Sequence, residues 1–188
     1  QKEVQTYDAF RGLLSPPDVL ISSFRTWEEM GRWYEILQRE QTQVSPEIMA
    51  KAEELTKGLS DDNAKLHAIY NYVSLRYRYV AIAFGIGRYQ PHAATEILGN
   101  QYGDCKDKHT LLAALLSAVG IRAYPALINS RMAVDTDVPS PGQFDHVISV
   151  VLEGSALAWM DTTPEVTPIG DLIFQLRAKP ALVIMPDK

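Results

Sequence analysis

The strongest structural signal in the chain is the stretch YGDCKDKHTLLAALLSAVG, which occupies residues 102–120. Its first three residues are typical of a tight turn, and Asp104 is a favourable cap for a helix that begins at Cys105. Apolar residues recur at helical spacing from Leu111 to Val119, and Gly120 then ends the pattern. The stretch predicts an amphipathic helix with a cysteine in its first turn.

Three further helices are predicted upstream, where cap residues precede apolar residues at helical spacing. Their signals begin at Thr26, at Ser45-Pro46 and at Ser60. Downstream of Gly120 the apolar period changes to two, and Gly154-Ser155 is typical of a two-residue hairpin loop. Strands are predicted over Ile121–Asn129, His146–Glu153, Ala156–Thr163 and Ala181–Met185. Pro125 indicates a bulge or an edge position in the first of these strands. Helices first and an antiparallel sheet second predict an α+β fold, with a helical N-terminal half packed on the sheet.

The predicted domain organisation is an extended arm or linker over residues 1–25 followed by one domain over residues 26–188. The arm is weakly patterned and contains Pro16-Pro17. Because the chain opens on Gln1 with neither a methionine nor a signal segment, we expect it to be part of a longer polypeptide.

Composition and charge exclude several classes of function. The 188 residues include 18 Lys and Arg against 23 Asp and Glu, a formal net charge of −5, so no basic face for nucleic acid is expected. The longest apolar run, Leu111–Ile121, is too short to cross a bilayer, so no membrane span is expected in this segment. The single cysteine, Cys105, excludes an intrachain disulfide and a Cys-rich zinc module.

Cys105 is the first candidate for chemistry. A lone cysteine is most often a small buried hydrophobe, but here a turn delivers it to the tip of a helix among charged residues. The helix dipole favours a thiolate there, and Lys106 and Lys108 are expected to add positive charge. Such a nucleophile needs a base, and four histidines compete for that role: His67, His92, His109 and His146.

The hairpin register distinguishes His146 from the other three histidines. With a two-residue loop at Gly154-Ser155, residues whose numbers sum to 309 face each other, which sets Asp161 opposite Ile148. His146 lies two residues from Ile148 on the same sheet face, so His146 and Asp161 become diagonal neighbours within side-chain reach. We therefore expect these two side chains to pair, whereas Asp145 points to the opposite side of the strand.

These residues resemble the bacterial transglutaminase-like superfamily, whose fold is a papain-like cysteine-enzyme core. The resemblance runs from about Trp27 to Val183. It is carried by the order Cys105, His146, Asp161 and by the segments YGDCKDK at 102–108, FDHV at 144–147 and WMDTT at 159–163. The resemblance implies that Cys105 is the nucleophile, His146 the general base and Asp161 the residue that orients the histidine. Candidates for the oxyanion hole are Gln90 or Tyr102, together with the backbone N–H of Cys105.

The function that follows is cysteine-dependent acyl transfer on an amide or peptide substrate through a thioester, which water or a second amine can resolve. Two alternatives stay open: a non-catalytic module of the same fold that binds peptide or protein, and a structural domain of a larger envelope protein. No cofactor is expected, since Gly85-x-Gly87 lacks the third glycine of a dinucleotide fingerprint and no metal motif occurs. The resemblance implies an extracytoplasmic location in a bacterial envelope.

Overall fold

The computed structural model describes residues 19–81, 85–154 and 156–185, so most of the predicted arm lies outside the described residues. The α-helices are α1 (Trp27–Arg39), α2 (Pro46–Leu55), α3 (Asp62–Arg76), α4 (Ala94–Asn100) and α5 (Cys105–Ala118). The strands are β1 (Arg78–Tyr79), β2 (Tyr102–Gly103), β3 (Ala123–Ile128), β4 (His146–Glu153), β5 (Ala156–Met160) and β6 (Ala181–Val183). Short 3-10 helices are η2 (Gly85–Arg88), η3 (Pro141–Gln143) and η4 (Phe174–Leu176). No helix in the described ranges is long and apolar enough to cross a membrane.

Side-chain caps determine where the main helices begin. Thr26 accepts a hydrogen bond from the backbone N–H of Glu29 at α1, and Ser45 accepts one from Ile48 at α2, as the sequence predicts. The third cap is Asp61 rather than Ser60, so α3 begins one residue later than its earliest signal.

The main sheet is antiparallel throughout, in the order β5-β4-β3-β6. Pro125 was expected at a bulge or an edge position, and although β3 itself lies between β4 and β6, the proline lies where the β6 ladder ends. The proline is tolerated because it lies just outside the β6 ladder, whose pairs begin at Ala126↔Val183, and its carbonyl accepts from the N–H of Ile184. The predicted α+β fold, with helices first and an antiparallel sheet second, is confirmed.

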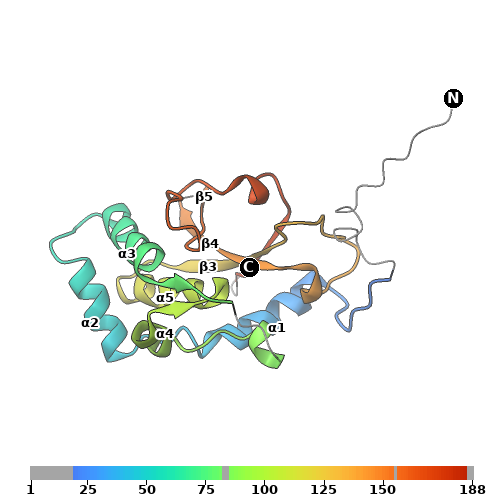
Figure 1. The fold of residues 1–188 in the computed structure, drawn as a ribbon, viewed down its shortest axis with the longest axis horizontal. Helices are drawn as coiled ribbons and strands as arrows, with labels where there is room; N and C mark the ends of the chain where they lie inside the picture. Colours follow the sequence, from blue (N-terminus) through green and yellow to red (C-terminus); the bar gives the residue numbers. More distant parts are fainter. Residues whose placement is uncertain (1–18, 82–84, 155, 186–188) are drawn as a thin grey trace.

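The core forms around α5, which packs against one face of the sheet. Its residues from Lys106 to Leu116 are all buried, and its leucines pack with apolar residues of α2, α3 and α4. On the other face of the sheet, Ile148 and Val150 pack against Leu176 of the C-terminal segment. Figure 1 shows these layers, with α5 on one side of β3 and β4 and the C-terminal segment on the other. The helix of the YGDCKDK stretch is thus held on every side, and the position of its first residue is fixed.

The residues just before α1 contact the domain. The Phe24 ring lies 5.5 Å from that of Trp33, and the Ser22 hydroxyl donates to the carbonyl of Pro139. The described end of the predicted arm therefore packs on the domain, near the loop that precedes β4.

Candidate active site

Cys105 is the first residue of α5, is partly buried, and carries a free thiol. A reciprocal capping box fixes this end of the helix. The Asp104 carboxylate accepts from the backbone N–H groups of Lys106 and Asp107 at 3.1 and 3.2 Å, and the Asp107 carboxylate accepts from the N–H of Asp104 at 3.2 Å. The first turn of a helix presents unpaired N–H groups and a partial positive charge, which favour an anion at this position.

The glycine of the Gly-Asp-Cys motif has a packing role. A Cβ atom at Gly103 would lie 2.6 Å from the Cβ of Asp107, a distance that real Cβ atoms essentially never show. The Asp107 side chain cannot easily retreat, because it also accepts the backbone N–H of His92 at 2.9 Å. Only glycine therefore lets β2 approach the helix start that carries the cysteine.

His146 and Asp161 form a hydrogen-bonded pair, as the register argument predicts. The observed pairs of β4 with β5, such as Ser149↔Met160, confirm the sum of 309. The Nε2 atom of His146 lies 2.8 Å from Oδ2 of Asp161. The other oxygen of Asp161 accepts from the backbone N–H and the hydroxyl of Thr163 at 2.9 and 2.8 Å, and the carboxylate is fully buried.

The surroundings of His146 favour its protonated form. Burial by itself lowers the pKa of His146, but hydrogen bonds to Asp161 and Cys105, and the negative charges of both, raise it to about 10. Since Nε2 faces Asp161, the other ring nitrogen, Nδ1, is the one left for the sulfur. A thiol beside an imidazole that is hydrogen-bonded to a buried carboxylate is an arrangement in which sulfur could act as a nucleophile.

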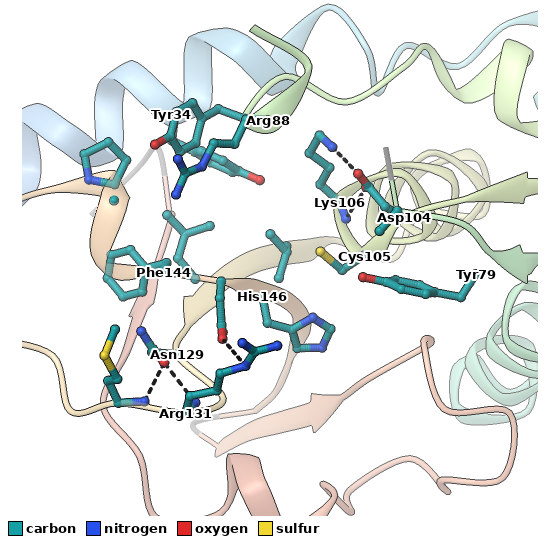
Figure 2. A pocket seen from close by; sticks show the side chains of 18 residues that line it. Tyr34, Tyr79, Arg88, Asp104, Cys105, Lys106, Asn129, Arg131, Phe144 and His146 are labelled. Carbon is teal, nitrogen blue, oxygen red and sulfur yellow. Dashed lines mark hydrogen bonds and ion pairs between the residues drawn. The ribbon is translucent and has the colours of Figure 1, made fainter. Parts of the chain in front are cut away.

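A cavity of about 420 Å³ opens beside the thiol. Its walls come from α1, β1, the start of α5, the end of β3 and the loop before β4. Figure 2 shows Cys105 and His146 on one side of this cavity and Phe144 on the opposite side. Pro141 and Gly142 also line it, so the loop preceding β4 borders the site. A substrate in this cavity would have the sulfur within reach.

The residue nearest the thiol that the sequence did not single out is Tyr79. It lines the cavity, Figure 2 shows its hydroxyl pointing toward the sulfur, and, after burial, the charge of Cys105 is one of the causes that raise the pKa of Tyr79. The sequence-based candidates Gln90 and Tyr102 do not line the cavity. The parallel register pairs Tyr79 with Gly103, so Tyr102 falls on the other face of this small sheet and is half-exposed.

The remaining three histidines have other surroundings, and none of them lines the cavity beside the thiol. His109 is fully buried, with Nδ1 2.7 Å from the hydroxyl of Ser149 on β4, and burial lowers its pKa to about 3. His92 contacts the Asp107 carboxylate through Nδ1 at 3.1 Å, and His67 lies within α3. In the described ranges, no three of the acidic, histidine or cysteine side chains are grouped so that they could hold a metal ion.

Two solved structures share this fold. A proposed protease from Parabacteroides distasonis aligns with a TM-score of 0.64 and 15% identity, over 80% of this chain and 30% of its own length. A proposed cysteine protease from Cytophaga hutchinsonii aligns with a TM-score of 0.51 and 16% identity, over 92% of this chain and 50% of its own. The chain thus spans half or less of either protein, and at such identities the likeness shows the fold alone. No curated protein matches the chain.

The sequence itself matches the family model of the transglutaminase-like superfamily over residues 49–147. The match begins in α2, includes the whole of α5 with Cys105, and ends just after His146. It covers more than half of the 188 residues. The chain therefore belongs to the transglutaminase-like superfamily.

Proposed function

We propose that this domain is a cysteine-dependent acyl-transfer enzyme, in which Cys105 is the nucleophile, His146 the general base and acid, and Asp161 the group that orients the imidazole. One observation carries the proposal: buried Asp161 is hydrogen-bonded to His146, whose imidazole in turn interacts with Cys105 at the wall of a cavity. A cysteine that only fills space in the core would need neither the imidazole nor the carboxylate.

The first half of the reaction forms a thioester. His146 takes the thiol proton, and the sulfur of Cys105 attacks the carbonyl carbon of an amide to give a tetrahedral oxyanion. When this intermediate collapses, the C–N bond breaks and the imidazolium of His146 donates its proton to the departing amine. The raised pKa of His146 keeps that proton available up to alkaline pH.

The second half resolves the thioester. Water or a second amine attacks the thioester carbon, His146 accepts the proton of the attacking group, and the C–S bond breaks to restore Cys105. Water yields a carboxylic acid and an amine yields a new amide. The same residues serve both outcomes, so the acceptor that enters the cavity decides between hydrolysis and transamidation.

Two hydrogen-bond donors are suited to the oxyanion. One is the backbone N–H of Cys105 in the first turn of α5, and the other is the hydroxyl of Tyr79. Partial burial, and the negative charges of Cys105 and Asp104, raise the pKa of Tyr79 above its usual value, so its hydroxyl stays protonated at neutral pH. Tyr79 thus replaces Gln90 and Tyr102 as our candidate side-chain donor.

An amine-release assay tests the proposal. Glutamine-containing peptides and bacterial cell-wall peptides are incubated with the wild-type protein and with Cys105→Ala, and released ammonia or primary amine is measured. We expect release by the wild type and none above background by the variant. The masses of the products are then measured by mass spectrometry with and without an added primary amine, which distinguishes hydrolysis from transamidation.

A failed screen is interpreted with a second measurement, the alkylation rate of Cys105 by neutral iodoacetamide. Alkylation at neutral pH that is no faster than that of a free cysteine would contradict a nucleophile activated by His146. Peptide binding without amine release, combined with that slow alkylation, would support the non-catalytic binding module instead.

A further inference from the structure

Two arginines enter the cavity beside the thiol. Arg131 follows β3 and Arg88 ends η2, and both line the cavity together with Cys105 and His146. Figure 2 shows their side chains approaching the centre of the cavity from opposite walls. The acyl-transfer chemistry proposed above uses neither of them.

The backbone of Arg131 is held firmly at the cavity wall. Buried Asn129 accepts hydrogen bonds from the N–H groups of Arg131 and Met132 at 2.9 and 2.7 Å through its side-chain oxygen. Its amide group donates to the carbonyl of Gln143 at 2.6 Å, which ties this turn to the loop before β4. The wall is therefore preorganised at the residue that carries the guanidinium.

The guanidinium of Arg131, by contrast, is weakly engaged. Its Nε atom lies 3.9 Å from the Asp145 carboxylate, and its side chain is 73% exposed. Both oxygens of Asp145 already accept hydrogen bonds from Ser130, at 2.7 Å from the N–H and 2.8 Å from the hydroxyl. The contact of Arg131 with Asp145 is thus a single long one through Nε, and most of the planar donor fork of the arginine is left for another acceptor.

Arg88 is positioned by stacking rather than by an ion pair. Its guanidinium carbon lies 5.3 Å from the centre of the Tyr89 ring, and that ring packs edge-on against Trp33 at 5.4 Å. Among the residues that the structure describes, no carboxylate pairs with Arg88.

The other charges around the cavity largely cancel. Lys106 and Asp104 both line the wall, but they are buried and form an ion pair with each other. Asp145 keeps its negative charge, which offsets part of the charge of Arg131 at 3.9 Å, because its hydrogen bonds from Ser130 come from neutral donors. With the Lys106–Asp104 pair cancelled, Arg88 and Arg131 together outweigh Asp145, so this wall keeps a net positive charge on a chain whose net charge is −5.

We infer that the acyl donor of this site is an acidic molecule, with a carboxylate close to the scissile amide that binds Arg131 and a second anionic group that binds Arg88. The inference rests on the proposed acyl transfer and names its substrate class. Guanidinium groups bind carboxylates through two parallel hydrogen bonds, which would also orient the amide over the sulfur. Neutral donors lack this interaction and bind less well.

The test needs no natural substrate. Iodoacetate and iodoacetamide react with a thiolate in the same way, with sulfur displacing iodide, and they differ in one negative charge. The ratio of their rates at Cys105 is measured by mass spectrometry in the wild type, Arg131→Gln, Arg88→Gln and Lys57→Gln. Lys57 lies just after α2 and does not line the cavity, so its variant removes an equal charge elsewhere.

We expect the iodoacetate-to-iodoacetamide ratio to fall roughly 3- to 10-fold in Arg131→Gln, and less in Arg88→Gln, because a nearby positive charge is lost. It should be unchanged in Lys57→Gln, and added salt should lower the wild-type ratio. In the peptide screen, donors with a glutamate side chain next to the scissile amide should release amine faster than the same peptides with glutamine at that position.

Failure of this inference is distinct from failure of the proposed function. Rapid alkylation by iodoacetamide, with a ratio that neither arginine variant alters, would overturn the acidic donor and leave the nucleophile intact. If both reagents alkylate Cys105 no faster than free cysteine, the acyl-transfer function itself is overturned. Both arginine side chains are exposed, and the unfolding transition of each variant verifies that it folds.

Discussion

The imidazole of His146 lies between a thiol and a buried carboxylate, and both favour its protonated form. Its pKa in the folded protein, about 10, exceeds the ordinary value of 6.5. Because the pKa of His146 is higher in the folded protein than in the unfolded chain, the protonated imidazole stabilises the fold. This contribution is complete below pH 6.5 and is lost as the pH rises through about 10. In the proposed acyl transfer, this is the proton that His146 donates to the departing amine.

We therefore predict that Asp161→Asn lowers the pKa of His146, because the imidazolium loses its buried anionic partner. NMR titration of the His146 ring, assigned with His146→Gln, measures the pKa directly, and the alkaline limb of kcat should move to lower pH with it. Asp145→Asn is the matched control. Its carboxylate bonds Ser130, so a smaller shift is expected, and an equal shift would contradict the assignment of Asp161.

A second residue-scale prediction concerns Tyr79. Removing its hydroxyl in Tyr79→Phe should lower kcat on the order of 10²-fold with little change in KM, the size expected for one oxyanion donor. Alkylation by iodoacetamide should change much less than kcat, because displacement of iodide forms no oxyanion and only the contact of Tyr79 with the sulfur is lost. Tyr102→Phe is the control, since Tyr102 does not line the cavity. A larger fall in kcat in Tyr102→Phe would instead support Tyr102, the candidate that the sequence suggested.

The pairing of His146 with Asp161 was predictable because it depends on local rules. A two-residue hairpin loop fixes the register, and the period of two in a strand then decides which side chains share a face. Tyr79 was not predictable in this way, because β1 has two residues and gives no periodic pattern. Its place beside the thiol depends on a parallel pairing with β2, a contact between distant parts of the chain.

At the scale of the element, the two lysines in the first turn of α5 do not play the part that the sequence predicted for them. Lys106 and Lys108 were expected to add positive charge at the thiol, but both are buried. Lys106 pairs with Asp104, and Lys108 donates to the carbonyls of Ser74 and Tyr77 at 3.2 and 2.8 Å, where α3 ends. Burial is the first cause that lowers the pKa of Lys108, to about 8. Sequence shows the charge of a lysine but not the carbonyls that it will meet.

The close approach of β2 to α5 yields an element-scale prediction. Gly103→Ala should destabilise the protein by about 1–3 kcal/mol, because the new Cβ overlaps Asp107 and disrupts the cap. Amine release should fall with it, since the cap positions Cys105. Gly99→Ala is the contrasting variant. Gly99 lies within α4 with open space around its Cβ position, so the variant's free energy of unfolding should rise by about 0.5–1 kcal/mol. Urea denaturation measures both, and equal stability of the two variants would argue against the packing role of Gly103.

At the scale of the whole molecule, the site is assembled from parts of the chain that lie far apart in sequence. The family match ends at residue 147, before β5 and Asp161, and begins after α1, which contributes Tyr34 to the cavity wall. The segment after Asp161 covers the second face of the sheet through Leu176 and adds β6 at the edge of the sheet. The hydroxyl of Tyr70 in α3 also lies 2.7 and 2.6 Å from the backbone carbonyl oxygens of Asp161 and Thr167, which share its single proton as acceptors. These contacts join the helical half to the backbone of Asp161 and of the segment that follows it.

The segment that matches the family should accordingly fail as an independent domain. A fragment of residues 49–147 retains Cys105 and His146 but loses Asp161, β5, β6 and most of β4, so the apolar face of α5 would have no sheet to pack against. We predict that this fragment shows no cooperative urea transition and no accelerated alkylation of Cys105. The full 188-residue chain is the control, and it should show both. A cooperative transition in the fragment would mean that the helices alone form the folding unit. Fast alkylation in it would mean that Cys105 is activated by the start of α5 without the buried carboxylate.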